Sequence, residues 1–180
     1  MKILITYKSY YGSSKQYALW LSEELNCEAK SLDEIKLLDL KDYDLIIHGG
    51  GLYAGRLSGI SFYKKNLSFF KENNIKLICF ACGASPSNKK VIAEMAINIF
   101  KGDMKDIPYF YCEGNYNYSV MSFIHKQMMK MMNKWLTKKI KKAKKPNPMD
   151  VEFQGLIFSH FERVDKKWIK QIIDYINSLQ

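Results

Sequence analysis

A run of hydroxyl-bearing residues around one glycine follows the first apolar segment of the chain. It consists of Ser9, Tyr10, Tyr11, Gly12, Ser13 and Ser14, with Lys8 before it, Lys15 after it and no acidic member. A bound phosphate needs several N–H or O–H donors, little negative charge and close approach of the backbone, which a loop entering a helix supplies. Serine is also common at ordinary helix starts, so a capped turn and a phosphate cradle both remain open. The run is neither a Walker loop, because no Gly-Lys-Ser/Thr follows, nor a dinucleotide fingerprint, because it has one glycine instead of three.

The elements that must position this run alternate along the chain. Mostly apolar segments predict strands at residues 2–7, 43–50, 75–83 and 108–112, and residues 27–31 read as a short strand between the first two. Helices are expected between and after them, at residues 13–25, 60–73, 89–100 and 165–179. This alternation predicts an α/β fold with a parallel sheet covered by helices on both sides. Ligands of such sheets bind beyond the carboxyl ends of the strands, which here are the loops at residues 9–14, 49–59 and 82–88.

The composition predicts one globular domain over residues 1–180. The chain is 47% apolar and 26% charged, with four cysteines. Its start turns polar after five residues, no apolar run is long enough to cross a bilayer, and so few cysteines suit a reducing compartment. We therefore expect a cytoplasmic protein.

The positive charge is concentrated in one stretch. The formal net charge is +10, and the segment from Gly114 to Met149 holds nine lysines with no Asp or Glu. Without that segment, 19 basic residues face 18 acidic ones. The excess therefore belongs to an insertion at about residues 115–150, while residues 151–158 read as a last strand.

The insertion is expected to form one long amphipathic helix over Val120–Lys145. Apolar residues recur there at steps of three and four, at positions 121, 124, 128, 131, 132, 135, 136, 140 and 143, and lysines recur every four residues on another face. Two interpretations remain open, a solvated face over the protein's own core and an interfacial helix on an anionic membrane surface, and a nucleic-acid surface is the third one to consider. The segment "KKIKKAKKP" has no aromatic residue to contact bases, so no nucleic acid is expected.

Several segments together resemble a known family. "ITYKSYYGSSKQYALWL" is similar to the flavodoxin phosphate-loop signature, with Ser14 in place of Thr and with Thr6 where an apolar residue is usual. "DYDLIIHGGGLYAGRLSG", "GNYNYSVMSFIHKQMMKMM" and "DKKWIKQIIDYI" resemble the menaquinone-dependent, oxygen-independent protoporphyrinogen IX dehydrogenases within that flavodoxin-like group. The resemblance implies a flavodoxin-like, doubly wound, five-stranded parallel sheet with the long basic helix inserted.

The resemblance also implies FMN as cofactor and assigns residues to it. The FMN phosphate would be held by Ser9, Gly12, Ser13 and Ser14, with backbone N–H groups of Tyr10 and Tyr11. One side of the isoalloxazine would lie along Gly50, Gly51, Leu52, Tyr53, Ala54 and Gly55, with Tyr53 as the stacking candidate. The pyrimidine side would meet Cys82, Gly83, Ala84 and Ser85.

By the same resemblance the activity would be dehydrogenation of a reduced, porphyrinogen-like substrate, with electrons passed to a quinone. Lysines and Arg56 near the flavin would meet substrate carboxylates. The alternative is a non-enzymatic flavodoxin that docks on partner redox proteins, although the usual acidic docking face is missing. We expect no catalytic acid–base residue and no metal site, because the flavin carries the redox chemistry. His48 is expected in the core, as is the Cys79–Cys82 pair despite its CxxC spacing.

Overall fold

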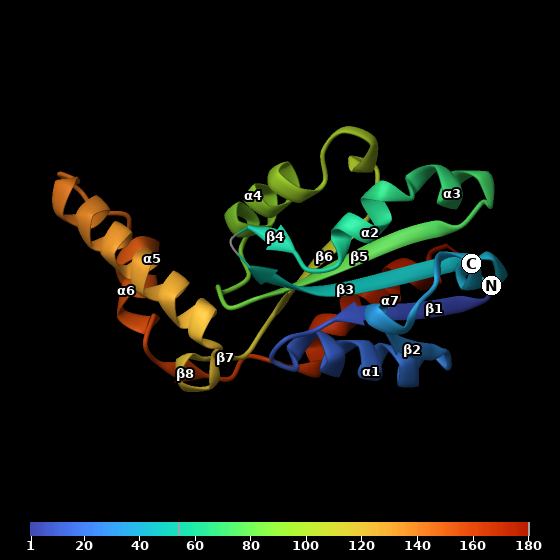
Figure 1. Ribbon diagram of the computed structural model, residues 1–180, viewed down its shortest axis with the longest axis horizontal. Helices are drawn as coiled ribbons and strands as arrows, with labels where there is room; N and C mark the ends of the chain where they lie inside the picture. The colour runs from blue at the N-terminus through green and yellow to red at the C-terminus, as the bar shows by residue number, and fades with distance from the viewer. Residues whose placement is uncertain (54, 180) are drawn as a thin grey trace. The chain divides into compact units, whose positions relative to one another are not determined.

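The computed structural model describes residues 1–53 and 55–179, which form two compact units (Figure 1). The first unit comprises Met1–Gly114 and Arg163–Gln180, and the second comprises Asn115–Glu162. The expected insertion at about residues 115–150 thus lies within the second unit, which continues to Glu162.

The first unit is built on the predicted parallel sheet. Its strands lie in the order β2-β1-β3-β5-β6, and a short β4 pairs antiparallel with β3. Their bounds are β1 Ile3–Lys8, β2 Glu28–Ser31, β3 Leu45–Tyr53, β4 Arg56–Leu57, β5 Lys76–Gly83 and β6 Tyr109–Glu113. The expected α/β class and five parallel strands are confirmed.

Helices cover both faces of the sheet, because β3 and β5 are buried on both sides. On one face α1 (Ser13–Leu25) and α7 (Lys170–Asn177) pack against Ile5, Ile47 and Phe80. On the other face lie α2 (Ile60–Lys65), α3 (Leu67–Glu72) and α4 (Lys89–Ile99). The single helix expected at residues 60–73 was wrong, since the chain leaves helical geometry at Asn66, with φ −116° and ψ 22°.

The second unit pairs β7 (Tyr116–Asn117) with β8 (His160–Phe161) and packs α5 (Phe123–Lys142) on α6 (Pro148–Leu156). The last strand predicted at residues 151–158 was wrong, because helix-start signals precede it. Asn147 accepts a hydrogen bond from the Met149 N–H, and Pro148 occupies the first turn. The long helix also starts later than expected, at Phe123, where the Ser122 hydroxyl accepts the His125 N–H at 3.3 Å.

The strand order locates the site. From β1 the chain moves outward to β2 and then returns to β3 on the other side of β1. The connections after β1 and β3 therefore diverge, and open α/β sheets generally bind their ligands beyond the carboxyl ends of two such strands. The expected phosphate run follows β1 at this point.

Candidate functional site: the carboxyl edge of the sheet

The first loop starts a helix without a capping side chain. Gly12 is the N-cap residue of α1, with φ +94°, a left-handed conformation that favours glycine. The Ser9 hydroxyl accepts the Gly12 N–H at 3.1 Å, and the Gly12 carbonyl accepts the Gln16 N–H at 2.9 Å. Ser13 and Ser14 thus lie inside the helix and not at its cap. The ordinary serine-capped turn is excluded, and the positive end of the α1 dipole stays open to an anion.

Two of the loop's hydroxyls connect it to other strands. Ser14 is buried and bonds to the Cys82 thiol, whose pKa burial raises to about 12 although this bond acts in the opposite direction. A Cβ added at Gly114 would lie 3.4 Å from the Ser13 Oγ, so the chain after β6 passes next to this serine. The loop is therefore held between the ends of β5 and β6.

The charge around the loop differs in part from expectation. The first turn of α1 contains no acidic residue. Lys8, however, forms an ion pair with Asp33, with 2.6 Å between Nζ and Oδ2, so this carboxylate offsets its charge. The main source of positive potential for an anion is therefore the start of α1, where no side chain caps the helix.

The second group of predicted residues forms a hairpin instead of a loop. Gly50, Gly51, Leu52 and Tyr53 lie in β3, and the chain turns back so that Tyr53 pairs with Arg56 in β4. Gly55 takes φ +73° in the turn, while Ala54 lies outside the described residues. The glycines have packing reasons: a Cβ at Gly50 would lie 2.3 Å from the Ser58 carbonyl oxygen, and one at Gly51 would lie 2.6 Å from the Tyr53 ring.

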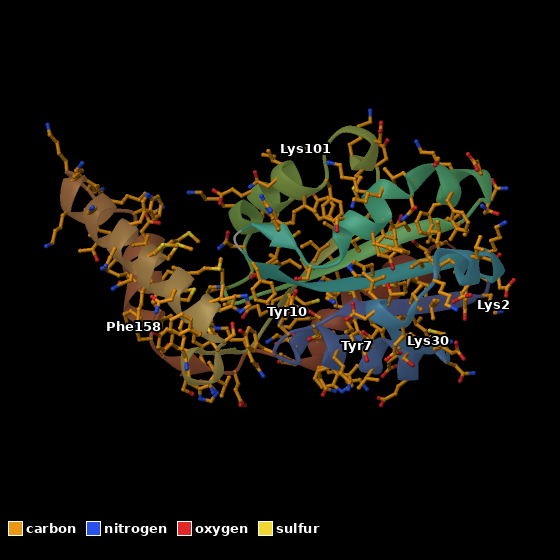
Figure 2. The ribbon with its side chains drawn as sticks, in the orientation of Figure 1. Lys2, Tyr7, Tyr10, Lys30, Lys101 and Phe158 are labelled. Atoms are coloured by element: carbon orange, nitrogen blue, oxygen red, sulfur yellow. The ribbon has the colours of Figure 1, made fainter. Side chains whose placement is uncertain are left out.

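Aromatic rings bring the hairpin and the first loop together. The Tyr53 ring lies 5.3 Å from that of Tyr10 at 87° and 6.2 Å from that of Tyr11 at 60°. Burial raises the pKa of Tyr53, so its hydroxyl stays neutral. Tyr10 is 58% exposed and lies at the opposite end of the strand region from Lys2 (Figure 2). Aromatic rings next to a helix start that no side chain caps are a combination that suits a flat ligand with a phosphate group.

The third predicted group offers backbone rather than side chains. Cys82 and Gly83 are buried at the end of β5, with Ala84 and Ser85 beyond it. The backbone carbonyl groups of residues 83–85 all accept hydrogen bonds from within the protein. The Gly83 carbonyl accepts the Gly114 N–H at 2.7 Å. The Ala84 carbonyl accepts a hydrogen bond from the Arg163 guanidinium at 2.9 Å, and the Ser85 carbonyl accepts one from the Tyr111 hydroxyl at 2.6 Å.

The sequence analysis did not predict that the segments around Glu113 and Asp165 come together at this edge of the sheet. The Tyr17 hydroxyl donates to the Glu113 carbonyl at 2.7 Å and accepts the Asp165 N–H at 3.1 Å. It thereby ties together the two segments that leave and re-enter the first unit. Gly114 could have been suspected as a glycine just after a strand, whereas no local signal marks Tyr17 or Arg163.

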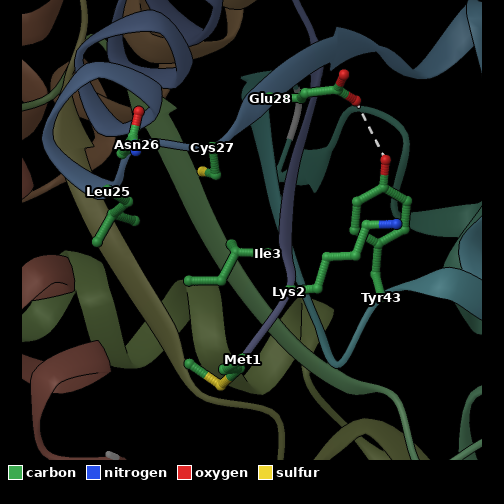
Figure 3. Close-up of a pocket in the computed structure, with 8 residues that line it drawn as sticks. All are labelled: Met1, Lys2, Ile3, Leu25, Asn26, Cys27, Glu28 and Tyr43. Atoms are coloured by element: carbon green, nitrogen blue, oxygen red, sulfur yellow. Dashed lines mark hydrogen bonds between the residues drawn. The ribbon is translucent and has the colours of Figure 1, made fainter.

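A separate cavity lies at the other end of β1. It has a volume of about 370 Å³ and is lined by Met1, Lys2, Ile3, Leu25, Asn26, Cys27, Glu28 and Tyr43 (Figure 3). The Tyr43 hydroxyl donates to the Glu28 carboxylate at 3.1 Å across it. None of its lining residues belongs to the predicted site.

Comparison with known proteins identifies the class to which this edge of the sheet belongs. The sequence matches the Flavodoxin domain family over residues 4–144, and the chain belongs to that family. An uncharacterized protein of Methanocaldococcus jannaschii is 27% identical over 122 residues, which cover 67% of this chain and 80% of that protein.

Among solved structures, the chain is similar to the following three proteins. The Trp repressor binding protein of Bacillus subtilis is 17% identical, with a TM-score of 0.46, over 63% of this chain and 83% of that one. A Lactobacillus acidophilus flavoprotein in complex with FMN is 17% identical, with a TM-score of 0.40, over 62% and 91%. A flavodoxin from the domain Archaea is 19% identical, with a TM-score of 0.37, over 63% and 85%.

Two kinds of feature were not found among the described residues. No group of three His, Cys, Asp or Glu side chains is arranged there to hold a metal ion. None of the helices in this part of the chain combines the length and apolar character needed to cross a membrane.

Proposed function

We propose that the chain binds FMN at the carboxyl edge of the sheet and uses it for electron transfer. The observation that carries this proposal is the α1 start, which has Gly12 at its cap and opens next to Tyr10, Tyr11 and Tyr53. The phosphate would accept N–H groups from the first turn of α1 and hydroxyl hydrogens from Ser9 and Ser13. FMN, when bound, supplies one- and two-electron redox chemistry, while the protein supplies orientation and electrostatics.

The first experiment is an absorbance spectrum of the purified protein with identification of any released cofactor, followed by titration with FMN and with riboflavin. Flavin bands with FMN near a one-to-one ratio are expected. A colourless protein that takes up no FMN would refute the proposal.

A matched pair of variants tests the phosphate cradle directly. Gly12→Asp places a carboxylate at the α1 start, where it repels phosphate and offsets the positive end of the helix dipole, at the cost of the backbone strain that φ +94° imposes on any side chain. Gly102 has a positive φ of 61° and, like Gly12, nothing within 4 Å of an added Cβ, so Gly102→Asp is the control. We expect Gly12→Asp to lower FMN affinity about 100-fold and riboflavin affinity by less than about threefold, because only FMN carries the charge. Gly102→Asp should change neither affinity.

We further propose that the electrons pass from a reduced, porphyrinogen-like substrate to a quinone. A quinone is lipid-soluble, so its reductase gains from contact with a bilayer, and α5 offers a suitable surface. Its Ile124, Met131 and Trp135 are 70%, 66% and 55% exposed and recur on one side, whereas Leu136, on the side that packs on α6, is 2% exposed. Lysines at positions 126, 130, 134 and 138 form a neighbouring ridge suited to anionic headgroups.

Membrane association is tested with intact protein and sedimented vesicles of phosphatidylglycerol or phosphatidylcholine. Ile124 on α5 and Ile97 on α4 are 70% and 71% exposed, so their serine variants form a matched pair. We expect binding to the anionic vesicles only, weakened several-fold by Ile124→Ser and by high salt and unchanged by Ile97→Ser. Equal effects of both substitutions would refute this surface.

The alternative function is a flavodoxin that carries electrons between soluble redox proteins, for which the basic surface would require an acidic partner. Oxidation of the reduced protein by menaquinone in liposomes, compared with oxidation by a soluble redox protein, separates the two. Ile124→Ser should slow only the first reaction if the quinone is the acceptor.

A further inference from the structure

A buried polar relay ends on the hairpin of the site. Among the described residues, the buried polar or charged side chains are Thr6, Ser14 and His48. Ser14 belongs to the phosphate loop. The other two lie on neighbouring strands, paired in register between β1 and β3, and both are completely buried.

The relay has a defined direction of donation. His48 Nε2 lies 2.8 Å from the Ser58 carbonyl oxygen, which only accepts, so Nε2 carries the hydrogen. In the neutral ring Nδ1 is then an acceptor, and the Thr6 hydroxyl donates to it at 3.1 Å. The Tyr63 hydroxyl in turn donates to Thr6 Oγ1 at 2.5 Å. The order is therefore Tyr63 in α2, Thr6 in β1, His48 in β3 and finally the backbone of Ser58.

Ser58 is the residue at which the hairpin returns to the body of the unit. Its N–H donates to the Gly51 carbonyl at 3.0 Å, and its carbonyl lies against Gly50. Gly59, the next residue, has φ +85°, and an added Cβ there would lie 2.6 Å from His48 Nε2. The imidazole therefore holds the return segment by one hydrogen bond and by direct packing.

The glycine stretch of the hairpin depends on such an anchor because it has no side chains of its own to bury. Positions 49–51 are all glycine, and the hairpin is otherwise held by Leu52, which packs against one core cluster, and by Leu57 of β4, which is buried in it. Directional hydrogen bonds within a low-dielectric interior fix one arrangement, which apolar packing alone does less strictly.

We propose that His48 is a positioning residue of this site, whose Nε2–H fixes Ser58 and thereby the glycine and tyrosine edge along which the flavin ring would lie. This inference rests on the proposed FMN function. His48 touches no ligand itself, and its effect passes through the hairpin backbone. Burial lowers the pKa of His48 to about 4, which keeps the ring neutral and the donor order intact at physiological pH. The neighbouring titratable groups, Tyr63 and Cys79, also stay neutral, because burial raises the pKa of each.

Two amide variants separate the bond to Ser58 from simple packing. In His48→Gln the amide nitrogen reaches the position of Nε2 and donates to Ser58. In His48→Asn the shorter amide reaches only the position of Nδ1, so it keeps Thr6 and loses Ser58. We expect His48→Asn to lower FMN affinity about tenfold and His48→Gln to lower it by less than about threefold, which corresponds to one hydrogen bond. Equal affinities in the two variants, whether both are normal or both are reduced, would overturn the proposal.

A second measurement needs neither a variant nor FMN. ¹⁵N NMR of the FMN-free protein should show the Nε2–H tautomer for His48, with ring signals constant from pH 8 to pH 5. An Nδ1–H tautomer, or titration near pH 6.5, would overturn the proposal. If the protein binds no FMN but His48 is the Nε2–H tautomer, the proposed function is refuted and the hydrogen-bond order is not. Failure of the FMN proposal and failure of the His48 proposal are thus distinguishable.

Discussion

The two units use their large apolar side chains in different ways. In the first unit they form two buried clusters, one on each side of the sheet. In the described part of the second unit three apolar residues are buried, Tyr116, Leu136 and Ile157, while nine are exposed: Val120, Phe123, Ile124, Met128, Met131, Trp135, Met149, Val151 and Phe158. The first unit therefore has a covered core on each side of its sheet, whereas the second unit leaves most of its large apolar side chains on the surface.

Glycine substitutions should show the largest difference between the units. A Cβ at Gly49 would lie 1.9 Å from the buried Phe80 ring, whereas one at Gly155 in α6 would have nothing within 4 Å. We expect Gly49→Ala to lower the free energy of unfolding by about 3 kcal/mol, through overpacking. Gly155→Ala should raise the stability of α6 by about 0.5–1 kcal/mol, because alanine favours helix. Urea unfolding measures the first and amide exchange in α6 the second, and a stable Gly49→Ala protein would contradict the packing of this strand.

The pH dependence of stability should be traced to the first unit's core. The pKa of His48 is near 4 in the folded protein and near 6.5 when unfolded, so the unfolded state binds more protons between these values. Stability contributed by neutral His48 is therefore present above pH 6.5 and is lost as the pH falls towards 4, by roughly 3 kcal/mol. Urea unfolding at several pH values measures this loss. The His48→Gln variant should lack this part of the slope, and an identical slope in both proteins would contradict the assignment.

The loss of one buried tyrosine hydroxyl in each unit should lower the stability of the two units by different amounts. Tyr17 bonds to both the Glu113 carbonyl and the Asp165 N–H, while Tyr116 donates at 2.6 Å to the Ile157 carbonyl alone. We expect Tyr17→Phe to cost about 2 kcal/mol in the first unit and Tyr116→Phe about 1 kcal/mol in the second. Native-state hydrogen exchange reads each unit separately. A larger effect of Tyr116→Phe would reverse the comparison.

The smallest differences should come from surface ion pairs. Lys8 pairs with Asp33 in the first unit, and Lys139 pairs with Asp150 at 2.6 Å in the second. Replacing either lysine by alanine should cost about 0.5 kcal/mol, and the cost should shrink at high salt. Thermal unfolding at two salt concentrations checks this. An effect above about 2 kcal/mol would show that the pair is far better shielded from water than its exposure indicates.

Much of the first unit could be predicted because its signals are local. Apolar runs marked β1, β3, β5 and β6, and turn residues such as Gly12 marked the boundaries of the elements, whereas the short polar β2 has no apolar run. Hydrophobic periodicity alone could not distinguish a helix from a strand at residues 148–156. The segment forms a helix that Asn147 caps, although its apolar residues also fit a strand. Periodicity also could not reveal that the hairpin glycines of β3 face Phe80, Ser58 and Tyr53, since these contacts depend on how distant elements pack.

The sequence by itself determined the class of fold, the glycine-containing turn between β1 and α1 and the location of the excess lysines, because periodicity, turn chemistry and charge act over a few residues. The tertiary structure alone decided which apolar residues of α5 are covered, because that depends on α6 packing against one side of the helix. It also brought Arg163 to the Ala84 carbonyl, 79 residues away, and Asp165 to Tyr17, 148 residues away. Contacts at such separations form only when the sheet has assembled, so no local pattern encodes them.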